Sequence, residues 1–322
     1  MNQRKKVIIG SLLTGILAFT SIFSSNLLIN NEKEADAASV DAASAEAVVT
    51  NALKVASAIT GELPAKRSKF VKQFAMSDGS YTAATYSMPV HYKEPKGSSK
   101  NGTWKEIDTT LVKSGKKNYK TKATDLSMKV SRKANKKSVV SMKRGKTSLS
   151  IALKGKKLKA AKAKRSNPKK KTATDVLNQN RVTYKGVMKN TSVSYDIFPE
   201  KVQEIVKISK KQKRKALSFK LNTKLKAKVK GKKVYFKTKK GKTKFTRMST
   251  VITDAGGVST SKVKLSYNKK SKALKVTPDK KWWNSKKRKF PVEIRTTYLT
   301  DKHGRDVKVG AAYAGTPDSN FG

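Results

Sequence analysis

The sequence predicts a mainly β protein, an antiparallel β-sandwich built of meanders and hairpins, with a short N-terminal helix. Three observations favour this class. A meander with strand periodicity lies in the middle of the chain, turn residues recur roughly every 8–12 residues, and no internal repeat of about 20–50 residues is convincing. With 322 residues the chain is long enough to bury a substantial core.

The central meander is the richest apolar stretch after the N-terminal segment. Val193, Tyr195 and Ile197 alternate with Ser194, Asp196 and Phe198, which is the period of a strand with one buried face. Pro199 predicts a turn, because proline cannot donate to a central ladder. The alternation resumes over residues 202–208 and again over 217–221. We therefore expect three successive antiparallel strands at the core of a sheet.

Residues 1–37 have the features of a signal peptide. The basic group Arg4-Lys5-Lys6 precedes an apolar run, and Ala35-Asp36-Ala37 offers a small-x-small cleavage site. An uncleaved anchor is the alternative, because apolar character persists to Ile29. In either case we expect the rest of the chain to be outside the cytoplasmic membrane, and a cleaved chain to be secreted without membrane contact.

Residues 38–61 are expected to form a helical leader or linker. Apolar residues from Val48 to Ile59 recur at helical spacing, and Gly61 can end the helix. The apolar side is thin, so a linker is favoured over a partner-binding helix.

Residues 62–300 are expected to form one β-sandwich domain. Alternating apolar residues and turn signals place its elements as follows: hairpins at 70–90 and 139–153, strands at 225–230, 234–238 and 244–248, a hairpin at 263–276, and a final strand at 290–294. The pair Trp282-Trp283 could stack on a carbohydrate, but an edge of the core is the favoured interpretation.

Residues 154–175 are expected to form a mobile basic loop within this domain. Leu158 is the only large apolar side chain between Lys154 and Lys171, and that stretch has no acidic residue. Such a composition cannot bury enough surface to hold one conformation. We therefore predict that the segment is disordered in the free protein and is a principal contact for polyanions.

The charge balance is the strongest functional signal. Lys and Arg number 75 against 21 Asp and Glu, a formal net charge of +54, which predicts association with polyanions. Lysine greatly outnumbers arginine, which suits diffuse attraction rather than bidentate recognition. The candidate polyanion-binding residues are Lys154, Lys156, Lys157, Lys159, Lys162, Lys164, Arg165, Lys169, Lys170, Lys171, Lys224, Lys226, Lys228 and Lys230.

No motif indicates catalysis. The chain has no Cys, which excludes disulfides and thiol chemistry. Asp196, Glu200 and Glu204 could supply a glycosidase pair, but neutralising nearby lysines is the favoured role. His91 and His303 have no motif partners, so no metal site is expected. The sequence predicts no cofactor and no enzyme.

Several short motifs in a fixed order carry a resemblance. They are Ser77-Asp78-Gly79-Ser80, Pro89-Val90-His91-Tyr92, Gly102 to Asp108, Val193 to Pro199, Glu204-Ile205-Val206, Asp254-Ala255-Gly256-Gly257, Pro278 to Trp282 and Arg288 to Ile294. This order resembles the N-terminal β-rich region that precedes DNRLRE-type domains in Gram-positive secreted proteins, as in the wall-associated RHS-repeat proteins. The resemblance covers roughly residues 62–322, and residues 301–322 look like the start of a truncated DNRLRE-type domain. The lysine content exceeds what the resemblance requires, and the ending suggests a fragment or a truncated copy.

Charge, signal and resemblance together predict a secreted, non-enzymatic structural or binding module that associates electrostatically with the bacterial cell wall, as the N-terminal part of a larger surface protein. The expected partners are anionic wall polymers, teichoic acid and peptidoglycan. One alternative is an extracellular nucleic-acid- or polyanion-binding protein, which is less favoured because the basic runs lack interleaved aromatics. Another is the leader region of an RHS-type toxin delivery protein. Lysines that merely keep a β protein soluble are the simplest alternative.

Overall fold

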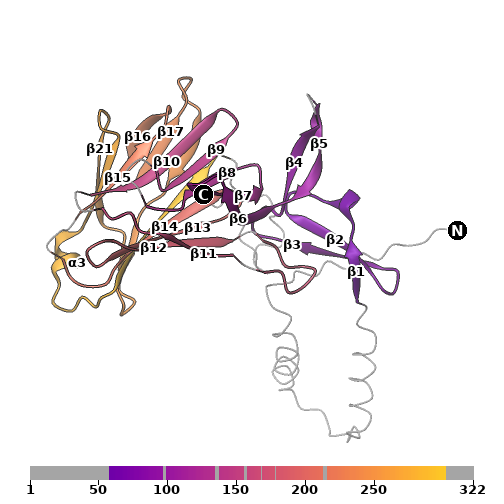
Figure 1. Cartoon of the computed structure of the whole chain (residues 1–322), viewed down its shortest axis with the longest axis horizontal. Helices are drawn as coiled ribbons and strands as arrows, with labels where there is room; N and C mark the ends of the chain where they lie inside the picture. Colours follow the sequence, from indigo (N-terminus) through magenta and orange to yellow (C-terminus); the bar gives the residue numbers. More distant parts are fainter. Residues whose placement is uncertain are drawn as a thin grey trace, which may run out of the picture. The chain divides into compact units, whose positions relative to one another are not determined.

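The computed structural model describes residues 58–96, 99–134, 138–155, 158–167, 169–177, 179–212 and 216–301 (Figure 1). The predicted signal peptide, most of the predicted leader and residues 302–322 lie outside the described residues. Of the described residues, 58–86 and Thr172–Thr174 form one compact unit, and the remainder forms a second.

The first unit is a three-stranded antiparallel sheet in the order β1-β2-β3. Its elements are β1 (Ile59–Glu62), a 3₁₀ turn η2 (Pro64–Lys66), β2 (Val71–Met76) and β3 (Tyr81–Thr85). The hairpin predicted at 70–90 is therefore present, but it belongs to this unit and not to the sandwich. The predicted helix is wrong at its described end, because Ile59 pairs with Met76 and Glu62 with Phe74 in the sheet.

The second unit is an antiparallel β-sandwich, which confirms the predicted fold class. One layer is an eight-stranded sheet in the order β21-β22-β15-β10-β9-β8-β7-β6. Its strands are β6 (Asp108–Ser114), β7 (Asn118–Ala123), β8 (Ser127–Ser131), β9 (Val140–Arg144), β10 (Thr147–Lys154), β15 (Leu217–Asn222), β21 (Val263–Asn268) and β22 (Ala273–Pro278).

The other layer is a ten-stranded sheet whose main path runs β11-β12-β13-β14-β23-β18-β17-β16. Its strands are β11 (Ala163–Ser166), β12 (Asn180–Met188), β13 (Thr191–Ile197), β14 (Lys201–Ile208), β16 (Lys226–Lys230), β17 (Lys233–Lys237), β18 (Thr243–Arg247), β19 (Val251–Thr253), β20 (Ser259–Thr260) and β23 (Val292–Thr300). A separate hairpin of β4 (His91–Lys96) and β5 (Ser99–Glu106) and a short helix α3 (Lys280–Asn284) complete the unit.

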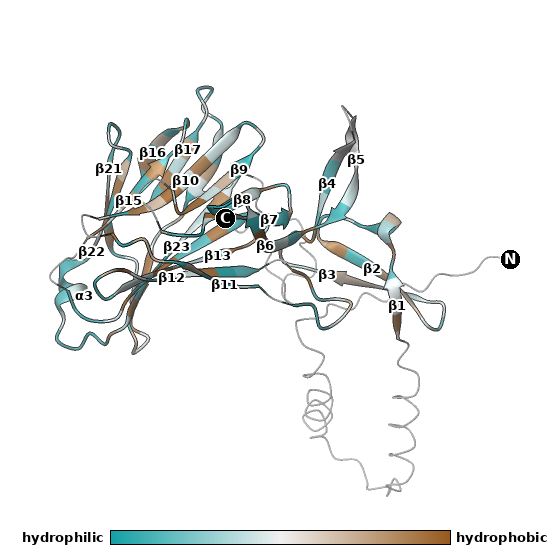
Figure 2. Ribbon diagram, viewed as in Figure 1, coloured by the Kyte–Doolittle hydropathy of each residue, from teal (hydrophilic) through white to brown (hydrophobic). Residues whose placement is uncertain are grey.

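One hydrophobic core lies between the two layers. Leu149 and Phe219 enter it from the eight-stranded sheet, and Tyr195, Val206 and Phe236 enter it from the ten-stranded sheet, all almost fully buried. Along most strands, hydrophobic and hydrophilic residues alternate (Figure 2). This period-two pattern places apolar side chains inward and leaves polar side chains outside.

The central meander differs from its prediction at the third strand. β13 and β14 pair as expected, with the turn closed by a hydrogen bond from Phe198 N to Lys201 O. The third strand, β15, leaves for the other sheet and pairs with β10 and β22. The free edge of β14 is instead filled by β23, which pairs with it along its whole length from Lys201 to Ile208. Alternation shows which side chains are buried but not which edge a strand joins.

Candidate polyanion-binding groove

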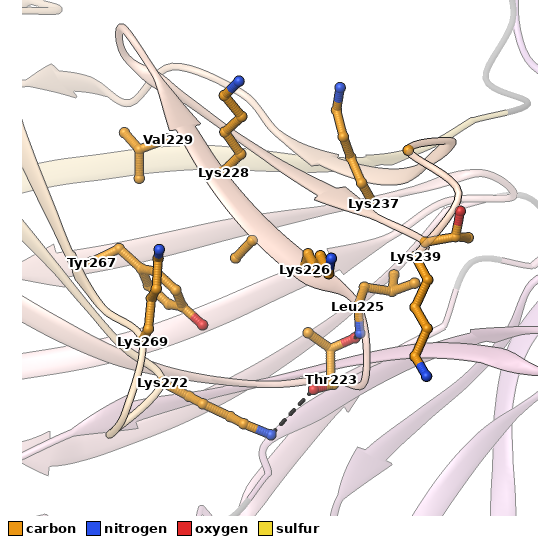
Figure 3. A pocket seen from close by; sticks show the side chains of 13 residues that line it. Thr223, Leu225, Lys226, Lys228, Val229, Lys237, Lys239, Tyr267, Lys269 and Lys272 are labelled. Carbon is orange, nitrogen blue, oxygen red and sulfur yellow. Dashed lines mark hydrogen bonds between the residues drawn. The ribbon is translucent and has the colours of Figure 1, made fainter.

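A groove of about 980 Å³ lies in the sandwich beside β16, the last strand on the main path of the ten-stranded sheet (Figure 3). Residues of the β21–β22 turn, from the other sheet, line it as well. The full lining is Thr223, Leu225, Lys226, Ala227, Lys228, Val229, Lys237, Thr238, Lys239, Gly241, Tyr267, Lys269 and Lys272.

Strand β16 supplies both apolar and cationic surface to the groove, because apolar residues and lysines alternate along it. Ala227 and Val229 are half-buried and pack against the core, whereas Lys226, Lys228 and Lys230 are exposed. The strand ends at Gly231, whose φ of 55° is one that side chains with a Cβ rarely adopt. Lys224, which precedes the strand, is exposed as well.

The groove combines an apolar floor with a cationic rim. Leu225, Ala227, Val229 and Tyr267 are half-buried and pack against the core. The lysines of the lining are Lys226, Lys228, Lys237, Lys239, Lys269 and Lys272, and the lining contains no Asp or Glu among the described residues.

One hydrogen bond and one pKa shift bear on the chemistry of the groove. Lys272 Nζ donates a hydrogen bond to the Thr223 carbonyl oxygen over 3.2 Å (Figure 3). Burial raises the pKa of Tyr267 above its ordinary value of 10.0, at which the hydroxyl is already protonated at neutral pH. Lysine ammonium groups act as point charges with three donors each. The groove can therefore attract a flexible anionic chain without selecting a planar group.

The segment predicted as a mobile basic loop is structured over its described part. Lys154 is the last residue of β10, Lys162 forms an isolated bridge with Lys133, and Lys164 and Arg165 lie in β11, antiparallel to β12. The Lys159 N–H donates to the Val187 carbonyl oxygen over 2.8 Å. The prediction of disorder is wrong here, because backbone pairing at the edge of β12 holds a sequence that lacks large apolar groups.

Side-chain contacts anchor the same segment. The Arg165 guanidinium lies 4.2 Å from the centre of the Tyr119 ring and donates to the Leu111 carbonyl oxygen. Lys170 forms an ion pair with Glu106, and the Lys171 N–H donates to Asp175. The described basic side chains of the segment remain exposed, while Lys156 and Lys157 lie outside the described residues. The alternation of Ala161 and Ala163 with lysines was the signal that could have identified this strand.

The three carboxylates considered for catalysis serve different structural roles. Asp196 accepts two hydrogen bonds from Arg181, over 2.5 and 2.7 Å, and Glu200 lies 3.6 Å from Arg144. Both therefore neutralise basic neighbours as predicted, although the neighbours named here are arginines and not lysines. Glu204 is different, because its side chain points into the core.

Glu204 belongs to a polar cluster inside the sandwich. It is 1% exposed, and burial raises its pKa to about 7, although the Arg247 charge and a 3.1 Å hydrogen bond from the Tyr195 hydroxyl oppose the rise. Arg247 is fully buried and donates to the hydroxyls of Thr250 and Thr296. A raised carboxyl pKa can mark a general acid. This carboxyl is closed off from solvent and from substrate, so we assign it to the core.

The histidines and tryptophans considered in the sequence analysis were the remaining candidates. His91 is 1% exposed, and His303 lies outside the described residues. Trp283 is buried, and the Arg288 guanidinium stacks 3.6 Å from the centre of the Trp282 ring, as expected at an edge of the core. Within the described ranges, no group of three or more His, Asp or Glu side chains is placed to hold a metal. No helix in the described part of the chain is long and apolar enough to span a membrane.

The chain is similar to three curated nucleases. It is 24% identical over 249 residues to the tRNA nuclease WapA of Bacillus subtilis strain 168. It is also 24% identical over 244 residues to the tRNA(Glu)-specific nuclease WapA of Bacillus subtilis subsp. natto and to the tRNA3(Ser)-specific nuclease WapA of Bacillus spizizenii. Each match covers 73% of this chain and 10% of the relative. No protein-family model matches the chain, and no solved structure matches it.

These similarities correct two predictions made from the sequence. The relatives are named as enzymes, which contradicts the prediction that the protein is not an enzyme. The same finding overturns the predicted function of a non-enzymatic wall-binding module. The chain spans about a tenth of the length of these relatives, so the similarity is confined to one region of each.

Proposed function

We propose that this chain is a polyanion-binding region of a larger tRNA nuclease similar to WapA, and that the whole protein is an enzyme. The relatives' names support the enzymatic part of the proposal. The observation that carries the regional part is the groove beside β16, whose rim of lysines has no described carboxylate next to it. A net charge of +54 adds a long-range attraction to any polyanion.

The proposed polyanions are anionic wall polymers, teichoic acid first and peptidoglycan second. The signal-like N-terminus would deliver the region to the side of the membrane where these polymers lie, so the proposed location is secreted and wall-associated. The relation to DNRLRE-type and RHS-repeat proteins, suggested by the order of the motifs, is part of the same proposal. In this role the region would hold the nuclease at the surface of the cell.

The proposal is tested with the chain from Ala38 to Gly322 and purified Gram-positive walls, with and without their teichoic acid. We expect binding at low salt that is weaker on walls without teichoic acid. Binding should be lost at about 1 M NaCl, where the Debye length is about 3 Å. Binding that is unchanged by salt would contradict an electrostatic mechanism.

A groove variant locates the interaction. Replacing Lys226, Lys228, Lys237 and Lys239 by Ser should weaken wall binding more than a control that replaces Lys185, Lys189, Lys210 and Lys211, which are exposed lysines outside the groove. Both variants lose four positive charges. A difference in wall affinity between them therefore depends on where the lysines lie and not on the net charge.

A further inference from the structure

The outer surface of the eight-stranded sheet is a second cationic surface, separate from the groove. We name it the Lys-Ser face, after the residues that point outward from seven of its strands. Its lysines are Lys120 and Lys122 on β7, Lys129 on β8, Lys143 on β9, Lys154 on β10, Lys220 on β15, Lys264 on β21 and Lys275 on β22. All except half-buried Lys220 are exposed.

The strand register places these lysines on one face. Directly paired residues point to the same side of a sheet. Across one row the pairs are Lys120 with Lys129, Lys129 with Ser141, Ser141 with Ser150 and Ser150 with Asn222. Across another row the pairs are Lys154 with Ser218, Ser218 with Lys275 and Lys275 with Ser266. Neighbours along the strands, such as Met128, Met142 and Phe219, are buried in the core, so the lysines point away from it.

Small side chains flank most of the paired lysines on this face. Lys143 pairs with Ser127 on one side and with Ser148 on the other, and Lys220 lies between Ala152 and Ala273. In the row through Lys154 and Lys275, lysine and serine alternate across strands that lie about 4.8 Å apart, whereas Lys120 and Lys129 are direct neighbours. An extended ligand can approach the ammonium groups closely, and the serine hydroxyls add donors for phosphate oxygens.

The charges on this face are nearly all available. Strands β7, β8, β9, β10, β15, β21 and β22 contain no Asp or Glu. In the described part of the chain, Lys122 is the one lysine of the face that forms an ion pair, with Asp108 over 3.2 Å. A ligand that carries regular negative charges would therefore displace counterions and not an internal partner.

The same strands lack outward-facing aromatic side chains among the described residues. Tyr119 and Phe219 are almost fully buried, and Tyr267 packs inward beside the groove. Nucleic-acid-binding surfaces for single strands add aromatic stacking to positive charge, because bases have apolar faces. The Lys-Ser face has the charge without the stacking partners. It fits a polymer of phosphodiesters that has no bases.

We propose that the Lys-Ser face binds a linear, base-free phosphodiester polymer of the wall, of the glycerol-phosphate teichoic acid type, which lies across the strands. This inference rests on the proposed function. It adds the type of wall polymer that is bound and the surface that binds it. Each lysine would neutralise one phosphate, with no requirement for a particular sugar or substituent.

The test uses the chain from Ala38 to Gly322 and purified glycerol-phosphate teichoic acid, with tRNA at equal phosphate concentration as the comparison. In the face variant, Lys129, Lys143, Lys220 and Lys275 become Ser, and the control is the variant at Lys185, Lys189, Lys210 and Lys211 defined above. Flexible single strands lose about 0.7 in the slope of log K against log salt for each neutralised charge. We therefore expect the face variant to lose about 3 in this slope for teichoic acid, the control to lose less than half of that, and tRNA binding to fall equally in both.

The possible outcomes separate the two proposals. If the wild-type chain fails to bind teichoic acid and walls at low salt, the proposed function is wrong. If it binds but the face variant and the control lose affinity equally, only the Lys-Ser face is wrong. A selective loss of tRNA binding would make this face a nucleic-acid surface and overturn the inference. Should the Ser variant lose its cooperative thermal transition, Gln at the same positions keeps the aliphatic stems and gives the same test.

Discussion

Seven strands of the eight-stranded sheet contain no carboxylate, whereas the ten-stranded sheet holds Glu204 and Arg247 inside the core. The two sheets also differ in how their charged residues outside the core are paired. On the ten-stranded sheet, Asp196 pairs with Arg181, and Glu293 pairs with Arg295 and Lys207. On the eight-stranded sheet the lysines stand next to serines. The ten-stranded sheet therefore uses part of its charge within the fold, and the eight-stranded sheet leaves most of its lysines exposed.

Because of this difference, we expect the two sheets to respond to different solution conditions. Buried groups respond to pH, because ionisation changes their cost of burial. Exposed lysines respond to salt, because screening weakens their attraction to a ligand. We expect pH to act on stability mainly through the ten-stranded sheet, and salt to act on binding through the exposed lysines.

Arg247→Met should give the largest loss of stability. The Arg247 charge lowers the pKa of Glu204 without a direct ion pair, and its removal leaves the buried carboxylate without a compensating charge. By analogy with broken buried ion pairs, the loss is at most about 3–5 kcal/mol. Here the loss should be largest at pH 9, where Glu204 is ionised, and smaller at pH 5, where it is protonated. Urea denaturation at both pH values measures it.

The matched variant in the other sheet is Leu149→Ala, which truncates a fully buried apolar side chain whose cross-strand partner is Met142. A cavity of this kind costs about 2–5 kcal/mol, and that cost should be the same at both pH values. If Arg247→Met lost the same free energy of unfolding at pH 5 and pH 9, the proposed difference in pH response between the two sheets would be wrong.

Glu204 should make the free energy of unfolding fall as the pH rises from about 4.5 to 7. Burial raises its folded-state pKa from 4.5 to about 7. In this window the unfolded chain loses the proton and the folded protein keeps it, so ionisation favours unfolding. The fall amounts to about 3 kcal/mol at about 1.4 kcal/mol per pKa unit. It should flatten above pH 7.

The Glu204→Gln variant should lack this fall, because its amide does not titrate and can still accept from Tyr195. Leu149→Ala serves as the control and should retain the fall. Stability curves from urea denaturation between pH 4.5 and 8 compare the three proteins. A fall of the same size in Glu204→Gln would assign the titration to another group.

Arg165→Ala should have the smallest effect. Loss of its contact with Tyr119 and its hydrogen bond to Leu111 should cost about 1 kcal/mol, by analogy with partly exposed cation–π pairs. Arg165→Lys should recover part of this, since it keeps the charge but loses the planar group. Lys164→Ala, at the exposed neighbouring position, should change stability by less than about 0.5 kcal/mol. Equal losses of stability in Arg165→Ala and Lys164→Ala would show that the Arg165 side chain does not anchor the basic segment.

The alternation of apolar residues was sufficient to predict many of the strands. It predicted the burial of Val193, Tyr195 and Ile197, and glycines 145, 231 and 241 marked turns with positive φ. Alternation reports which side of a strand is buried, and this is a local property of the sequence. It could not predict that β15 changes sheets, because the choice of edge depends on β23, more than seventy residues away in the sequence.

The candidate site was predicted in part. The exposed lysines of β16 followed from their alternation with Ala227 and Val229. The groove did not, because Lys269 and Lys272 reach it from a turn that is distant in the sequence. The Lys-Ser face was missed for the same reason. Lys129 and Lys275 share a face only through the register of the intervening strands, and no single strand of the face carries more than two of its lysines.

The position of β23 has a consequence for the order of events during folding. This strand, Val292–Thr300, fills the space between β14 and β18 in the ten-stranded sheet. Until it arrives, β14 has an open edge, and the hairpin of β17 and β18 has no partner to join it to the rest of the layer. Long-range pairing of this kind delays folding, because a long loop must close first. A chain that is synthesised from its N-terminus must therefore keep this sheet incomplete until nearly all of its described length has been made.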